Sequence, residues 1–112
     1  MKFLIFASVL LLNSVVLAQD FLPATEDIPL MDGLYQVEET ATFDTPSEKM
    51  TIISALTQKS PQQIKRYYRQ VLTNLGWTAR KDTDYARGPD TLTIEITQNS
   101  KTSVQFTLVQ KN

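Results

Sequence analysis

Few side chains of this 112-residue chain could take part in a reaction, because the sequence contains neither histidine nor cysteine. Their absence removes thiol nucleophiles, disulfides, thiolate metal sites and the commonest acid–base catalyst and zinc ligand. The carboxylate Glu95 lies between Thr93 and Thr97, with no second acid, base or nucleophile assigned beside it. General acid–base catalysis needs such partners within hydrogen-bond reach. We therefore interpret Glu95 as a solvated strand residue and predict that the protein is not an enzyme.

Cofactor and nucleic-acid motifs are not found either. The three glycines lie in three different segments, so they cannot form the glycine-rich loop that cradles a phosphate. The acidic pairs Glu26-Asp27 and Glu38-Glu39 lack the spacing of a calcium-binding loop. The 11 basic and 12 acidic residues give no basic excess of the kind that nucleic-acid binding uses. We predict no cofactor, no metal site and no nucleic-acid partner.

Trp77 is a candidate ligand platform, because an indole ring can stack on sugars, bases or aromatic ligands. The residue directly follows Gly76, which we expect to end a helix. That position also suits packing across the last helical turn onto Leu72 or onto a sheet. We favour this core interpretation, and a ligand groove beside Trp77 is the alternative.

A second candidate site is the basic set Lys65, Arg66 and Arg69. Charge is unevenly distributed, since residues 19–58 contain eight carboxylates and one lysine, whereas residues 59–112 contain nine basic residues and four carboxylates. The two halves of the chain therefore attract each other. One interpretation of the basic set is ordinary solvated charge. The other is a basic helix face that binds an acidic protein or anionic lipid headgroups.

These basic residues need a helix to bring them onto one face, and residues 60–77 predict one. Ser60 and Gln63 have the spacing of a capping box, and Pro61 occupies the first helical position, where no N–H is needed. Gly76 can adopt the left-handed conformation that ends a helix. The apolar residues at helical spacing are Ile64, Tyr67, Tyr68, Val71, Leu72 and Leu75. One face of the helix must therefore lie on an apolar surface.

Strand-like segments surround this helix. Residues 37–44 and 50–58 are joined by a loop containing Pro46, which suits an antiparallel hairpin. In a second hairpin, apolar residues alternate with polar ones; these are Leu92, Ile94, Ile96, Val104, Phe106 and Leu108. Short strand-like runs surround Trp77 and Tyr85. We predict an α+β fold, a two-layer sandwich with one helix packed on an antiparallel sheet in the order ββαβββ.

The N-terminal residues predict a secretory signal peptide. Lys2 precedes an apolar run that is shorter than the roughly 20 residues needed to span a bilayer, and small residues suited to cleavage end at Ala18. We expect no transmembrane span after cleavage. An exported chain without cysteine fits a bacterial periplasm, with secretion as the alternative. The predicted organisation is a signal peptide (1–18), an acidic, proline-marked N-terminal arm (19–36) and a single α+β domain (37–112).

The N-terminal arm is too apolar for a solvated linker. One interpretation is that residues 28–35 lie across the domain and close one end of its core. The other is that the arm is a docking peptide, which would contact a partner through Ile28, Leu30 and Met31.

Two segments carry a resemblance to known proteins. Residues 28–34 read Ile-Pro-Leu-Met-Asp-Gly-Leu, and the helix contains Tyr67-Tyr68 followed by Leu75-Gly76-Trp77. In these features the chain resembles small exported, periplasmic proteins of proteobacteria whose function is unknown. The resemblance implies export, but it brings no activity, ligand or catalytic residue.

The function that we predict from the sequence is a non-catalytic, soluble periplasmic interaction module with a protein partner in the cell envelope. The chain offers binding surfaces and no reaction centre. The alternative is a domain that binds a small ligand or an envelope component, through a threonine-rich sheet face or beside Trp77. Because the short runs near Trp77 and Tyr85 leave a sheet edge open, we also expect a weak homodimer formed by strand pairing.

Overall fold

The computed structural model describes residues 20–112. The predicted signal peptide, residues 1–18, lies outside the described residues, as does Gln19 of the arm.

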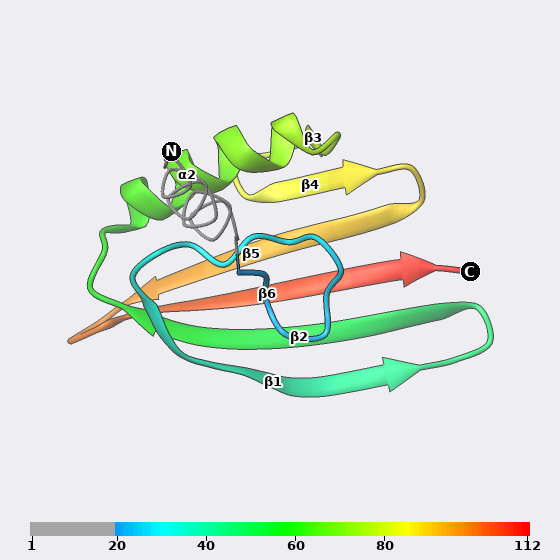
Figure 1. Cartoon of the computed structure of the whole chain (residues 1–112), viewed down its shortest axis with the longest axis horizontal. Helices are drawn as coiled ribbons and strands as arrows, with labels where there is room; N and C mark the ends of the chain where they lie inside the picture. Colours follow the sequence, from blue (N-terminus) through cyan, green and yellow to red (C-terminus); the bar gives the residue numbers. More distant parts are fainter. Residues whose placement is uncertain (1–19) are drawn as a thin grey trace, which may run out of the picture.

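The described residues form one antiparallel sheet of six strands with a single helix packed against it (Figure 1). The helix is α2 (Pro61–Asn74). The strands are β1 (Leu34–Asp44), β2 (Glu48–Thr57), β3 (Thr78–Ala79), β4 (Asp84–Arg87), β5 (Asp90–Gln98) and β6 (Thr102–Lys111). Their order across the sheet is β1-β2-β6-β5-β4-β3, so β6 pairs with both β2 and β5, and β1 and β3 form the edges.

The predicted fold class, an α+β two-layer sandwich with the order ββαβββ, is wrong. The structure is mostly antiparallel sheet, and four strands follow the helix, because the short runs at β3 and β4 both pair. Neighbouring strands are about 4.8 Å apart, so six strands are roughly 24 Å wide. One helix is about 10 Å in diameter and cannot cover that width. The single 14-residue helix therefore makes only part of the second layer.

The predicted helix and both of its ends are confirmed. The Gln63 amide donates to Ser60 Oγ at 3.1 Å, and the Ser60 amide donates to Gln63 Oε1 at 2.8 Å, which completes the capping box. Gly76 has a φ of +93°, and the amides of Gly76 and Trp77 donate to the carbonyls of Thr73 and Leu72. This pattern is a Schellman motif. Leu75, predicted on the apolar face, is 39% exposed because it lies at the end of the helix.

Strand alternation divides the sheet into two faces. On the helix side, the buried residues include Ile53 and Ala55 of β2, Leu92 and Ile94 of β5, and Val104, Phe106 and Leu108 of β6. Ile64, Tyr68 and Leu72 of α2 are buried against them. The Tyr68 and Phe106 rings meet edge to face with centroids 5.3 Å apart. The alternation predicted for the last hairpin is thus confirmed.

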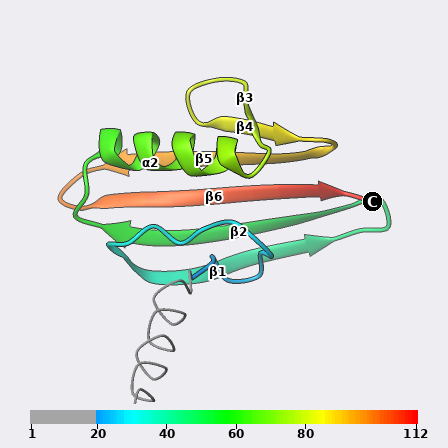
Figure 2. The ribbon, with the colours of Figure 1, turned by 45° about the horizontal axis from the view of Figure 1, so that its top comes forward.

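The N-terminal arm crosses the same face of the sheet beside α2 and covers a further part of it (Figure 2). Leu22, Ile28 and Met31 are buried in the same core as the helix. The Tyr68 hydroxyl donates to the Pro29 carbonyl at 2.8 Å and accepts the Met31 amide at 3.2 Å. Burial raises the pKa of this hydroxyl well above its ordinary value, so it stays protonated and able to donate. A buried hydroxyl of α2 therefore holds the arm in place.

Candidate interaction surface

Neither α2 nor the arm packs on the second face of the sheet, because both contribute to the core on the other face. Side chains of a strand alternate between faces, so the residues between the buried ones point away from the helix. On β2 these include Met50 and Ile52, and on β6 they include Thr107 and Val109. We call this side of the sheet the open face.

Apolar residues gather on the open face near the β1–β2 hairpin. Met50 lies opposite Phe43 on one side and Val109 on the other, and Ile52 lies in the next row of the same face. Phe43 is 56% exposed, while the other three side chains are half-buried. We call Phe43, Met50, Ile52 and Val109 the apolar patch. Within residues 20–112 these four side chains lie on one face of three adjacent strands, β1, β2 and β6.

The part of the open face over β5 is polar. Thr91, Thr93 and Thr97 share this face with Glu95. Glu95 is exposed, and its Oε1 accepts a hydrogen bond from Gln105 Nε2 at 3.2 Å.

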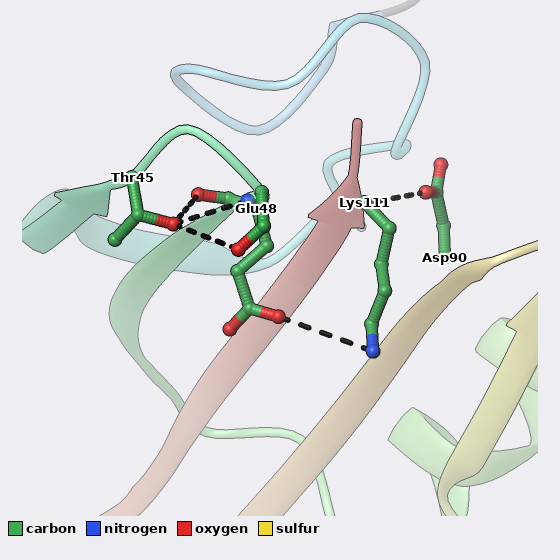
Figure 3. Close-up of polar contacts among 5 residues, drawn as sticks. Thr45, Glu48, Asp90 and Lys111 are labelled. Atoms are coloured by element: carbon green, nitrogen blue, oxygen red, sulfur yellow. Dashed lines mark hydrogen bonds and ion pairs between the residues drawn. The ribbon is translucent and has the colours of Figure 1, made fainter.

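A polar network braces the hairpin end of the sheet beside the apolar patch (Figure 3). Lys111 Nζ lies 4.0 Å from Glu48 Oε1, and the Lys111 amide donates to Asp90 Oδ1 at 3.2 Å. Thr45 Oγ1 accepts the Glu48 amide at 3.1 Å. These contacts join the β1–β2 turn, the start of β5 and the end of β6. The strands beneath the patch are therefore tied together at this end.

The edge strand β1 contributes Phe43 to the apolar patch, but the strand as a whole is acidic. Its 11 residues include Glu38, Glu39 and Asp44 and no basic residue. Among residues 20–112, no lysine or arginine is ion-paired with these three carboxylates; the Glu39 carboxylate accepts a hydrogen bond from Thr42. The pairing of β1 with β2 shifts register twice, between Tyr35 and Glu38 and again between Glu39 and Ala41.

The basic residues Lys65, Arg66 and Arg69 lie on α2 as predicted, but only one of them forms an ion pair. Lys65 Nζ is 2.9 Å from Asp82 Oδ2, and this hydrogen bond and charge hold the pKa of Asp82 below its ordinary value. Arg66 and Arg69 are exposed, and within residues 20–112 neither is joined to a carboxylate by an ion pair. The basic surface open to a partner is thus formed mainly by the two arginines.

The structure places Trp77 in the core, where its side chain is only 2% exposed. The Arg87 guanidinium lies over the indole ring, 4.4 Å from the ring centroid. Arg87 also donates to both carboxylate oxygens of Asp27, at 2.9 and 3.2 Å, and this contact raises the pKa of Arg87. Hardly any indole surface is left for a ligand, and the ring instead supports the ion pair that joins the arm to β4.

The three arm residues proposed for partner contact have little free surface. Ile28 and Met31 are buried in the core, and Leu30 is half-buried beside them. The sequence did not single out Phe43, Met50, Ile52 or Val109. The feature that could have indicated the patch is in β2, where the adjacent residues Ile52 and Ile53 place apolar side chains on both faces of the strand. A strand with apolar residues on both faces does not reveal which face the rest of the chain will cover.

Comparison of the chain with protein-family models, with curated proteins and with solved structures found no match. The resemblance to exported proteobacterial proteins therefore stays a prediction. In the part of the chain that the structure describes, no helix is long and apolar enough to cross a membrane. In that part, no three acidic, histidine or cysteine side chains lie close enough together to hold a metal ion.

Proposed function

We propose that the protein is a non-catalytic interaction module of the bacterial periplasm that binds a protein partner through the open face of its sheet. The observation that supports this function most strongly is the apolar patch, which lies uncovered on a braced region of the sheet. Exposed apolar surface next to polar residues is typical of protein contact sites. The threonines of β5 and the carboxylates of β1 would form the polar rim.

The aromatic residue at the centre of this proposal is Phe43. Among residues 20–112, Phe43 is the most exposed of the large hydrophobic side chains. Aromatic side chains are enriched at protein interfaces because they bury a large area at a small cost in conformational entropy. A partner that covered Phe43 would at the same time cover Met50, its cross-strand neighbour.

Site-specific photo-crosslinking in the producing cell tests this function. A photoreactive phenylalanine analogue at position 43 should form an adduct with a discrete partner, which mass spectrometry identifies. The matched control carries the same analogue at Gln70, an exposed position on the helix side close to Arg66 and Arg69. Adducts from position 70 and none from position 43 would move the binding surface to the basic helix face.

Export is tested by the mature N-terminus of the same protein. If the predicted signal peptide is removed, N-terminal sequencing of material from the periplasmic fraction should begin at Gln19. Recovery of the mature chain in the culture medium would support secretion instead.

A further inference from the structure

The partner's binding mode can be inferred from the free edge of β1. Among the described residues, β1 pairs only with β2, although it is 11 residues long. In an antiparallel pair, every second residue directs its N–H and C=O groups away from the neighbouring strand. These groups are a template on which another extended chain can pair. At the opposite edge, β3 has only two residues and offers much less backbone.

The two faces of β1 differ in chemistry. Ala41 and Phe43 lie on the open face, because they are opposite Ile52 and Met50 of β2. Glu39 and Thr42 lie on the helix side, because they are opposite Ile53 and Thr51. Asp44, opposite Lys49, is also on the helix side, whereas Glu38, opposite Ser54, is on the open face. A strand added beside β1 would therefore meet the apolar Ala41 and Phe43 on one face and the acidic Glu39 and Asp44 on the other.

We propose that β1 accepts an extended segment of the partner protein, with alternating apolar and basic side chains, as a seventh strand of the sheet. This inference rests on the proposed function. The segment's apolar side chains enlarge the apolar patch beside Phe43, and its lysine or arginine side chains pair with Glu39 and Asp44 on the helix side. Opposite charges and apolar pairs across adjacent strands stabilise such a contact.

Charge also favours a basic partner segment over a second copy of this chain as the strand that pairs with β1. Two antiparallel β1 strands paired about their centres would bring Glu38 and Glu39 close to the same residues of the other copy. Like charges opposite one another destabilise strand pairs. At neutral pH a basic strand is therefore a better occupant of this edge than another β1.

Synthetic peptides test the inference with the full mature chain. The probe is an octapeptide of alternating valine and lysine, with blocked ends. A valine–glutamate octapeptide controls for charge, and a proline–lysine octapeptide controls for backbone pairing, because proline has no N–H to donate. Binding is followed by NMR titration of the backbone amides and by their hydrogen exchange. We expect the valine–lysine probe to protect the β1 amides and to bind at least about tenfold more tightly than either control.

A charge reversal gives the second measurement. Glu39→Lys should weaken binding of the valine–lysine probe about tenfold. The matched control is Glu95→Lys, which makes the same charge change at an exposed strand position away from the edge, and it should change binding less than twofold. Both variants should melt close to the wild type, because both side chains are exposed.

Three results would overturn the inference. Equal binding of the proline–lysine and valine–lysine probes would show a purely electrostatic contact. Unchanged β1 amides together with crosslinking from position 43 would leave the proposed function standing and exclude strand addition. Formation of a mixed dimer between Glu39→Lys and wild-type chains, detected by sedimentation, would assign the edge to a second copy.

Discussion

The helix-side face and the open face belong to the same six strands, yet one is a core and the other is a surface. On β2, Ile53 is fully buried while its neighbour Ile52 is only half-buried. The two side chains have the same chemistry and differ only in what covers them. The helix side is covered by α2 and the arm. Tyr68 of α2 and Leu22 and Ile28 of the arm are buried in the same core as the side chains of the sheet. The apolar content of a strand face therefore does not by itself identify a core. A face becomes a core only when another part of the chain packs on it.

The largest expected effect comes from uncovering the helix side. Deleting residues 20–32 removes Leu22, Ile28 and Met31 from the core, and their burial is worth about 4.5 to 9 kcal/mol at about 1.5 to 3 kcal/mol each. We expect the truncated chain to be largely unfolded in thermal denaturation followed by circular dichroism. Phe21→Ser, which changes an exposed residue of the same arm, should melt near the wild type. A truncated chain that melts within a degree or two of the intact one would support the docking-peptide interpretation.

A matched pair of aromatic substitutions compares the two faces directly. Phe106→Ala on the helix side should lower the free energy of unfolding by about 3 to 5 kcal/mol, since the ring is fully buried against Tyr68. Phe43→Ala on the open face should lower it by less than about 0.5 kcal/mol. Urea denaturation of both variants measures the difference. Similar losses would show that Phe43 is packed in the folded chain and would contradict its place on an open surface.

The contact between arm and helix gives a smaller, more specific effect. Tyr68→Phe removes the hydroxyl that bonds Pro29 and Met31 and leaves a buried carbonyl and a buried amide without that partner. We expect a loss of about 1 to 3 kcal/mol in urea denaturation. Hydrogen exchange should show the loss at the Met31 amide before the β6 amides open. Tyr67→Phe is the matched control on the adjacent, half-buried ring, and it should leave exchange at Met31 unchanged.

The smallest effect concerns the exposed Lys65–Asp82 pair. Lys65 lowers the pKa of Asp82 in the folded state, so the unfolded state binds more protons at acidic pH. The contribution of the pair is therefore present above the ordinary carboxyl pKa near 4 and is lost as pH falls through the lower, folded-state value. Asp82→Asn should abolish this part of the acid dependence and change stability little at pH 7. Thermal melts of the wild type and of Asp82→Asn between pH 2 and 7 would measure this acid dependence. A steeper loss of stability with falling pH in Asp82→Asn would contradict the stabilising role of the Lys65–Asp82 pair.

Local interactions made several features predictable from the sequence alone. The capping box at Ser60 and the glycine ending at Gly76 involve residues within a few positions of each other, so their geometry depends little on the rest of the fold. The alternation of β5 and β6 likewise assigned Ile94 and Phe106 to one face. Packing of Trp77, which we favoured over a ligand platform, follows from the same short-range ending of the helix.

Other features depended on contacts between distant segments. Short strand-like runs were predicted near both Trp77 and Tyr85, but the predicted order had only three strands after the helix. A two-residue strand such as β3 is too short for alternation to establish that it pairs independently. The expected open edge was placed near Trp77 and Tyr85, whereas the long edge is β1. That outcome depends on β6 pairing with β2, a contact between segments about 50 residues apart.

The sequence by itself determined the helix with both of its ends and the alternation of β5 and β6, because these properties arise from near neighbours in the chain. Only the tertiary structure decided which face of β2 became the core. The helix is too narrow to cover six strands, so the choice depended on where the arm lay, and the arm is held by Tyr68 and Arg87, respectively 39 and 60 residues from their partners Pro29 and Asp27. Once the arm and helix shared one face, Phe43, Met50, Ile52 and Val109 were left on the other.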